Sequence, residues 1–269
     1  MWLEVVLLAV VQAVTEFLPV SSSGHLVIIP ELFGWEDPIL TSITLSVVLH
    51  LGTGLALLAA LWSDWRWLGW GILGKGPNVM LARRLSLAIV GSTLFVGAIA
   101  IPLRDVFVGL RDPMLAATLL IVFGLFLALA DRFGNQGRSL RSTSLSVWVL
   151  VGAAQIISLI PGVSRSGIAM TVGRSLGVDR AAAARFSLLL MGPAVAGAGV
   201  IQLLDAIQAE EMVGDVRLLA VGTLVAAAVG ALTVRWLLDF VERHSLTVFA
   251  LYRVVVGVVA LVVLTWTGT

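Results

Sequence analysis

The stretch QAVTEFLPVSSSGH, from Gln12 to His25, organises the chain because it places polar groups inside an apolar N-terminal segment. It contains a carboxylate, a run of serines, a glycine and a histidine. A second stretch, PGVSRSGIAMT from Pro161 to Thr171, places serines and an arginine in another apolar region. Ionisable groups at membrane depth are costly, so they usually face a cavity and mark function. We therefore predict that the two stretches form the two halves of one site.

Composition indicates a polytopic membrane protein. Of 269 residues, 59% are hydrophobic and 12% are charged, whereas a soluble domain carries about 25% charged residues. The mean hydropathy is +1.05, and apolar runs long enough to cross a bilayer recur along the chain. The net charge of +1 does not suggest a nucleic-acid partner, and the absence of cysteine excludes disulfides and thiolate metal sites. The apolar N-terminus lacks the basic flank of a signal peptide, so we keep it in the fold.

The chain is predicted to open with a re-entrant helical hairpin. Residues 1–17 are apolar, Pro19 and the serines break the helix, and residues 26–29 are too short to cross a bilayer. Irregular backbone at membrane depth is tolerated where it lines a cavity. Residues 30–38, which include Glu36 and Asp37, are predicted to form an exposed loop.

The same pattern restarts in the second half of the chain. Residues 145–160 are apolar, Pro161 breaks them, and residues 172–176 are again too short to cross. Three full spans are predicted after each hairpin, at residues 43–62, 85–101 and 114–130, and then at residues 184–204, 218–237 and 248–266.

The predicted fold class is therefore all-α integral membrane, with an inverted-topology repeat in a single domain of residues 1–269. The first repeat covers residues 1–131 and the second covers residues 145–269. The motifs PVSSSG and PGVSRSG align at the proline, and an odd number of spans per repeat inverts the second copy. This architecture has six full spans and two re-entrant hairpins, and it places the site at the repeat interface.

Lysine and arginine counts predict the orientation in the membrane. Three basic residues lie on the N-terminal side: Arg104, Arg111 and Arg217. Eleven lie on the opposite side: Arg66, Lys75, Arg83, Arg84, Arg132, Arg138, Arg141, Arg174, Arg180, Arg235 and Arg243. The positive-inside rule makes the richer side cytoplasmic, so both termini are expected outside, together with the loop at 205–215 that contains Glu210 and Glu211.

Gln12 and Glu16 are four residues apart and share one helix face. Such a pair can supply oxygen ligands to one hard cation while substrate phosphate completes the shell. The alternative is a polar pair that only packs two helices together.

Ser21, Ser22 and Ser23 follow a proline that ends the helix, so they offer hydroxyls and free backbone N–H groups. They can cap the next helix, and a helix N-terminus also binds anions. His25 can act as a general base or acid, or it can be a satisfied packing residue.

Arg165 lies between Ser164 and Ser166 in apolar sequence and needs an anionic partner. Its planar fork suits phosphate oxygens, and the two serines with Thr171 can supply further donors. The alternative is an ion pair with Glu16 that holds the two repeats together.

Other ionisable residues in the apolar segments are left outside the predicted site. His50 stands beside glycines that suit close helix packing. Arg185, Arg235 and Arg253 lie near span ends, where their side chains are expected to snorkel.

At these motifs the chain strongly resembles the undecaprenyl-diphosphate phosphatase family that is linked to bacitracin resistance. The first family signature corresponds to Gln12, Glu16 and FLPVSSSGH at residues 17–25, and the second to residues 161–167 with Thr171. Two departures stand out: Gln12 carries the amide variant of the first acidic position, and Leu94 stands where many members have proline.

The resemblance implies hydrolysis of undecaprenyl diphosphate to the monophosphate, which recycles the lipid carrier for cell-wall peptidoglycan synthesis in the bacterial cytoplasmic membrane. It implies interdigitated inverted repeats, a site open to the periplasmic side and a divalent cation, Mg²⁺ or Ca²⁺, at Glu16 and Gln12. The implied catalytic set is Glu16, Ser22, His25 and Arg165, and the surrounding substrate-binding set is Gln12, Ser21, Ser23, Ser164, Ser166 and Thr171.

Ser22 is the candidate nucleophile, with Glu16 or His25 as the group that takes its proton, and a water nucleophile stays open. The expected partners are an isoprenyl diphosphate lipid and the bilayer, and no nucleic acid is expected. The sequence leaves open whether the protein forms a homodimer. The rival function is a transporter or flippase of a polyprenyl phosphate lipid, because fold alone does not decide function. PAP2-type lipid phosphatases also carry a Ser-Gly-His, but their second motif needs a histidine after a Ser-Arg pair. After Ser164 and Arg165 the next histidine is His244, so this class is rejected.

Overall fold

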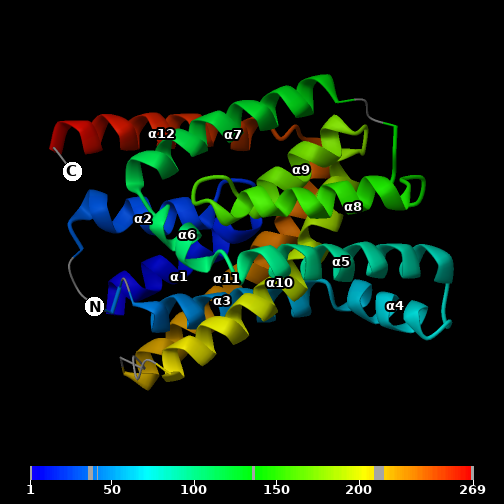
Figure 1. Cartoon of the computed structure of the whole chain (residues 1–269), viewed down its shortest axis with the longest axis horizontal. Coiled ribbons are helices and arrows are strands. Elements are labelled where there is room, and N and C mark those ends of the chain that lie inside the picture. The colour runs from blue at the N-terminus through cyan, green and yellow to red at the C-terminus, as the bar shows by residue number, and fades with distance from the viewer. Residues whose placement is uncertain (1, 36–38, 41, 135–136, 209–214, 268–269) are drawn as a thin grey trace.

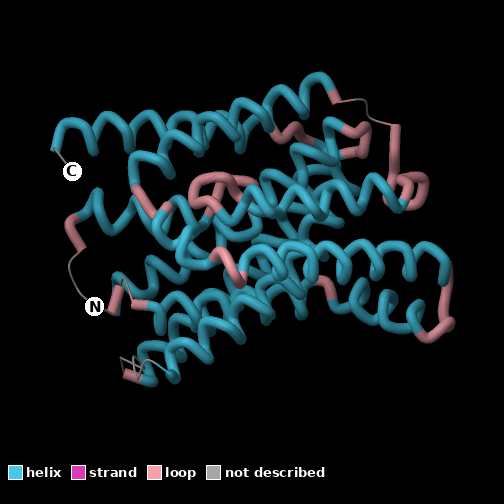
Figure 2. Tube along the Cα trace, viewed as in Figure 1, coloured by secondary structure: helices cyan, strands magenta, loops and turns pink. Residues whose placement is uncertain are grey.

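The computed structural model is an all-helical bundle that describes residues 2–35, 39–40, 42–134, 137–208 and 215–267 (Figures 1 and 2). Within those ranges the only β-type pairing is an isolated bridge between Arg138 and Val178. The acidic residues predicted in two outer loops, Glu36, Asp37, Glu210 and Glu211, lie outside the described residues. The prediction of an all-helical chain is confirmed for the described part.

The first hairpin consists of α1 (Trp2–Phe17) and α2 (Ser22–Phe33). α1 ends just before Pro19, and the Ser21 hydroxyl accepts a hydrogen bond from the backbone N–H of Gly24 at the start of α2. The prediction that a loop begins at residue 30 is wrong, because α2 continues through Pro30. The helix ends instead at Gly34, whose left-handed conformation (φ 59°) suits glycine and lets its N–H reach Glu31 O.

The second hairpin has the same plan, with α8 (Leu145–Ala153), the 3₁₀ turn η1 (Ala154–Leu159) and α9 (Arg165–Ser175). The chain breaks at Pro161, and the Ser164 hydroxyl accepts from the N–H of Gly167 as an N-cap. Both hairpins therefore turn at a proline and restart at a serine cap.

Most of the remaining helices are longer than those of the hairpins and apolar, whereas α4 and α6 are shorter. They are α3 (Ile43–Ala60), α4 (Trp62–Ile72), α5 (Val79–Ala100), the short α6 (Arg104–Gly109), α7 (Pro113–Phe133), α10 (Arg180–Gln208), α11 (Val216–Arg243) and α12 (Thr247–Thr267). Among the described residues, four helices are long and apolar enough to cross a membrane, namely α5, α7, α11 and α12. The pair α3 and α4, bent by 74° at Leu61, makes a fifth candidate span.

Helices from the two halves of the chain are interleaved. α1 packs against α11, α8 packs against α5, and α7 lies along α12 (Figure 1). Each hairpin also touches the other half, because α2 contacts α12 and α9 contacts α7. The start of α1 and the end of α12 lie at one end of the molecule, and the turn between α4 and α5 lies at the opposite end (Figure 1). The hairpin turns are thus enclosed by helices from both halves.

Asp131 at the end of α7 joins the elements at the second of these ends. Its carboxylate accepts from Nε of Arg174 at 3.1 Å, from Nε of Arg180 at 2.7 Å and from the backbone N–H of Leu246 at 2.9 Å. Arg174 is fully buried, so it is not a loop charge as the orientation count assumed. Without it, the count is ten basic residues on the predicted cytoplasmic side and three on the side of the termini. Arg185 likewise does not simply snorkel, because it pairs with Asp64 of α4 at 2.8 Å.

Candidate active site

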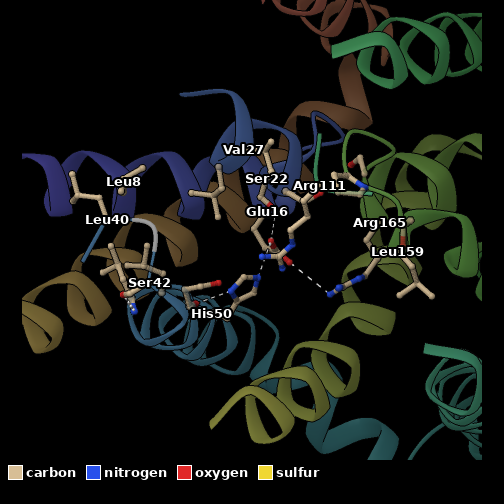
Figure 3. Close-up of a pocket in the computed structure, with 18 residues that line it drawn as sticks. Leu8, Glu16, Ser22, Val27, Leu40, Ser42, His50, Arg111, Leu159 and Arg165 are labelled. Atoms are coloured by element: carbon tan, nitrogen blue, oxygen red, sulfur yellow. Dashed lines mark hydrogen bonds and ion pairs between the residues drawn. The ribbon is translucent and has the colours of Figure 1, made fainter. Parts of the chain in front are cut away.

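A pocket of about 360 Å³ lies between the two hairpin turns, α3 and the link from α6 to α7 (Figure 3). Polar side chains from both signature stretches line it together with aliphatic side chains from the first third of the chain. The main aliphatic contributors are Leu8, Leu26, Val27, Leu40, Leu45 and Leu49. This mixture suits a ligand with a polar headgroup and an apolar tail.

Glu16, on the last turn of α1, contacts polar side chains from both signature stretches. Its Oε2 accepts from the Ser22 hydroxyl at 2.5 Å and from Nε2 of Gln12 at 3.0 Å. Its Oε1 lies 3.7 Å from Nη1 of Arg165, which is buried and has no hydrogen-bond partner among the described residues. The carboxylate is therefore held beside a hydroxyl that it can deprotonate and a guanidinium group with unused donors.

The starts of two helices reach this pocket. Ser22 and Ser23 begin α2, Arg165 begins α9, and all three line the wall with the cap residue Ser164. Unpaired N–H groups and the helix dipole make a helix N-terminus a site for anions. Arg165 adds a full positive charge with bidentate geometry for phosphate oxygens. The predicted juxtaposition of the two stretches around one pocket is what the structure shows.

Several of the predicted substrate-binding residues lie behind the wall. Gln12 is fully buried and touches Glu16, and the Ser21 hydroxyl caps α2. The Ser166 hydroxyl donates to Leu18 O at 2.8 Å, which ties the second hairpin to the first. The Thr171 hydroxyl donates to Gly167 O inside α9. These four side chains do not line the pocket, so direct contact with substrate stays a prediction for them.

His25 points away from the pocket. Its Nδ1 donates to Ser21 O at 2.7 Å, its Nε2 accepts from the Tyr252 hydroxyl at 2.9 Å, and the two rings stack at 5.7 Å. Both ring nitrogens are occupied in the neutral form, and His25 is not part of the pocket wall. Its catalytic role stays a prediction that these contacts do not favour.

His50 and Arg111 line the pocket although the sequence analysis left them out of the site (Figure 3). Nδ1 of His50 donates to Ser46 O at 2.8 Å, and Nε2 faces Glu16 Oε2 at 3.9 Å. Since α3 is otherwise apolar around His50, its ionisable ring was the signal that sequence reasoning discounted. Arg111 carried no comparable signal, because it follows a short exposed helix.

Arg253 is completely buried, so the prediction that its side chain snorkels is wrong. Its guanidinium group lies across both hairpin turns and donates to Pro19 O at 3.2 Å, to Gly162 O at 2.9 Å and to Val163 O at 2.9 Å. It also donates to Leu120 O of α7 at 3.3 Å. Carbonyls released where a proline breaks a helix need donors, and Arg253 supplies them to both turns at once.

The donor set around Glu16 suits only a partial metal cage. Among the described residues no three His, Cys, Asp or Glu side chains are arranged to hold a metal ion. However, Gln12 Oε1 is buried without a hydrogen-bond partner next to the Glu16 carboxylate. Mg²⁺ is commonly held by one or two carboxylates, water and substrate phosphates. The residues present therefore fit a hard cation that draws most of its ligands from substrate and water.

Comparisons with known proteins find similar chains over nearly the whole length. The family model described as bacitracin resistance protein BacA matches residues 5–259. The chain is 41% identical to an undecaprenyl-diphosphatase of Desulforudis audaxviator, with 97% of each chain covered. It is 39% identical to one from Thermomicrobium roseum, with 98% of each covered, and 41% identical to one from a Nocardioides species, with 97% of this chain and 96% of the relative covered.

Proposed function

Because the chain belongs to the undecaprenyl-diphosphatase family of bacitracin resistance proteins, we propose that it hydrolyses undecaprenyl diphosphate to undecaprenyl phosphate and inorganic phosphate. The observation that carries this proposal is the hydrogen bond from the Ser22 hydroxyl to Glu16, with Arg165 beside the same carboxylate. A nucleophile, a base and a phosphate-binding cation thus meet in one pocket. A transporter or flippase of a polyprenyl phosphate lipid needs no such combination and is not favoured.

The chemistry follows from these contacts. Glu16 takes the proton of Ser22 while Oγ attacks the terminal phosphorus, and the bond from that phosphorus to the bridging oxygen breaks. Undecaprenyl phosphate leaves with the bond electrons. Water then attacks the phosphoserine, the bond from phosphorus to Oγ breaks, and the proton held by Glu16 returns to Oγ. Inorganic phosphate leaves with both protons of the water. The guanidinium of Arg165 and the N-termini of α2 and α9 stabilise charge on the phosphoryl oxygens. Direct attack by water, with Glu16 as the base, is the second route, and trapping of a phosphoserine distinguishes the two.

A divalent cation, Mg²⁺ or Ca²⁺, belongs to the same proposal. Glu16 and the unpartnered Oε1 of Gln12 would hold it. When bound, such an ion neutralises charge on the phosphoryl oxygens.

We further propose that the protein is an inverted repeat in the bacterial cytoplasmic membrane with both termini outside. The matching caps of α2 and α9 and the interleaved packing of α1 on α11 and α8 on α5 support the repeat. The surplus of basic residues on the side opposite the termini supports the orientation. A C-terminal reporter that works only in the cytoplasm should be silent, and a bright signal would overturn the orientation.

The activity is tested with purified protein in detergent. The wild type should release phosphate from a short isoprenyl diphosphate, and Ser22→Ala should lose that activity while it keeps its Tm. Absence of phosphate release by a folded wild type, together with lipid translocation in vesicles, would favour the transporter.

A further inference from the structure

Two arginines reach the same pocket from different parts of the chain. Arg165 comes from the start of α9, and Arg111 comes from the link between α6 and α7 (Figure 3). That link is a tight turn, since Arg111 N donates to Val108 O at 3.1 Å and Asp112 N donates to Leu110 O at 2.9 Å. Asp112 then caps α7. The backbone of Arg111 is therefore fixed, and its side chain extends toward Ser22 and Glu16 (Figure 3).

Among the described residues, no carboxylate pairs with the guanidinium of Arg111. Within the described part of the chain it makes no hydrogen bond or ion pair, although it stands on the wall of a polar pocket. The one carboxylate among the described lining residues is Glu16, and that group is already engaged by Ser22, Gln12 and Arg165. Arginine stays charged in proteins. The pocket thus carries more positive than negative charge before substrate arrives.

We propose that Arg111 is a second phosphate-binding arginine, so that Arg165 and Arg111 each hold one phosphoryl group of a diphosphate. The inference rests on the proposed hydrolysis of a diphosphate lipid and deepens it, because it explains how the pocket distinguishes a diphosphate from a monophosphate. On this proposal a monophosphate supplies a phosphoryl group to one guanidinium group and leaves the other without one. After cleavage, the two phosphate products are no longer linked, so binding by both arginines no longer retains either product.

The test compares Arg111→Gln with Arg111→Lys and with a matched control, Arg217→Gln. Arg217 is also an exposed arginine assigned to the outer side, but it lies at the start of α11 and does not line the pocket. Steady-state kinetics on a short isoprenyl diphosphate give KM and kcat, and inhibition by pyrophosphate and by inorganic phosphate gives two binding constants. Calorimetric titration of pyrophosphate into each folded protein measures binding without turnover.

Arg111→Gln should raise KM and the inhibition constant of pyrophosphate by about ten- to a hundredfold, as expected for a lost hydrogen bond to a charged group. The inhibition constant of phosphate should change far less. Arg111→Lys should lie between wild type and Arg111→Gln, because lysine keeps the charge but loses the fork. Arg217→Gln should behave as wild type.

Four outcomes would overturn the inference. Arg111→Gln with unchanged KM and pyrophosphate binding shows that Arg111 does not touch the diphosphate. Equal weakening of phosphate and pyrophosphate shows a general charge effect, and the same defect in Arg217→Gln shows surface attraction. A lowered Tm for Arg111→Gln with normal pyrophosphate binding by Arg111→Lys shows a structural role. If the wild type itself releases no phosphate, the proposed function fails, and pyrophosphate titration still decides the role of Arg111.

Discussion

Ser21 and Ser164 share one unusual backbone conformation, with φ at 75° in both, although 143 positions separate them. Each hydroxyl accepts from the N–H three residues later, and each lies near the hydroxyl two residues later, at 3.3 Å for Ser23 and 3.2 Å for Ser166. A positive φ is strained for a residue with a Cβ. The same strained cap therefore begins the helix of each hairpin that points at the pocket.

At each of the two caps, glycine should replace serine with a smaller loss of stability than alanine. Ser164→Ala loses the cap and keeps the strain, so it should destabilise the protein by about 1 kcal/mol. Ser164→Gly loses the cap but relieves the strain, so its cost should be only a few tenths of a kcal/mol. Thermal melts in detergent measure both, and Ser21 should show the same order. Alanine as stable as glycine at both sites would contradict the strained-cap account.

Glu16→Gln should lower turnover by about two orders of magnitude or more, in line with general-base contributions. The amide keeps the shape but accepts the Ser22 proton poorly. Tm should not fall, because a buried charge is removed. Glu31→Gln, on the exposed face of α2, is the control and should match wild type. Near-normal turnover of a folded Glu16→Gln protein would make Glu16 a structural residue.

Variants of Arg165 distinguish a catalytic role from a structural role in which its ion pair with Glu16 holds the two hairpins together. If its guanidinium binds phosphoryl oxygens as charge develops, Arg165→Lys should lose mainly kcat and keep its Tm. If the 3.7 Å pair with Glu16 holds the halves together, Arg165→Ala should cost about 3–5 kcal/mol. Stability would then return in Glu16→Gln/Arg165→Ala. We expect a stable and inactive Arg165→Ala, and recovery in the double variant would assign Arg165 to bracing.

The two histidines should respond in opposite ways. His50→Asn removes a ring from the pocket wall, so turnover should fall at least about tenfold with little change in Tm. His25→Asn disrupts the contacts with Ser21 O and Tyr252, so Tm should fall by the equivalent of about 1–3 kcal/mol. Tyr252→Phe removes only the hydroxyl that binds His25, so its Tm should fall less than that of His25→Asn. A stable, inactive His25→Asn beside an active His50→Asn would restore the catalytic role that the motif predicts for His25.

Arg253→Met should be among the most destabilising single changes. It leaves the carbonyls of Pro19, Gly162 and Val163 buried without donors, at about 1–3 kcal/mol for each unsatisfied group. Activity should be lost with the fold, and Arg253→Lys should be intermediate because an ammonium reaches fewer carbonyls. Arg235→Gln on the exposed face of α11 is the control. A melting curve of Arg253→Met that matches wild type would show that the hydrogen bonds from Arg253 to the two turns contribute little to stability.

The helical class, the helix breaks at Pro19 and Pro161, and the meeting of Glu16 with Arg165 were all predictable from the sequence alone. Hydropathy and proline positions are local signals, and the cost of a carboxylate and an arginine in apolar sequence identified Glu16 and Arg165 without coordinates. Serine after a helix break likewise predicted a cap among Ser21, Ser22 and Ser23. The matching cap at Ser164 was not predicted and comes from the structure.

Which side chains share the pocket and which lie behind it became visible only in the folded chain. His25 and His50 look alike as ionisable groups in apolar segments, but His50 faces Glu16 and His25 faces Tyr252. Arg253 was buried against two turns that precede it by many residues, and Arg111 came from a link with no motif. The physical reason is that contacts between distant segments set the direction of a side chain. The same contacts decide which donor reaches a backbone carbonyl that has no partner in its own helix.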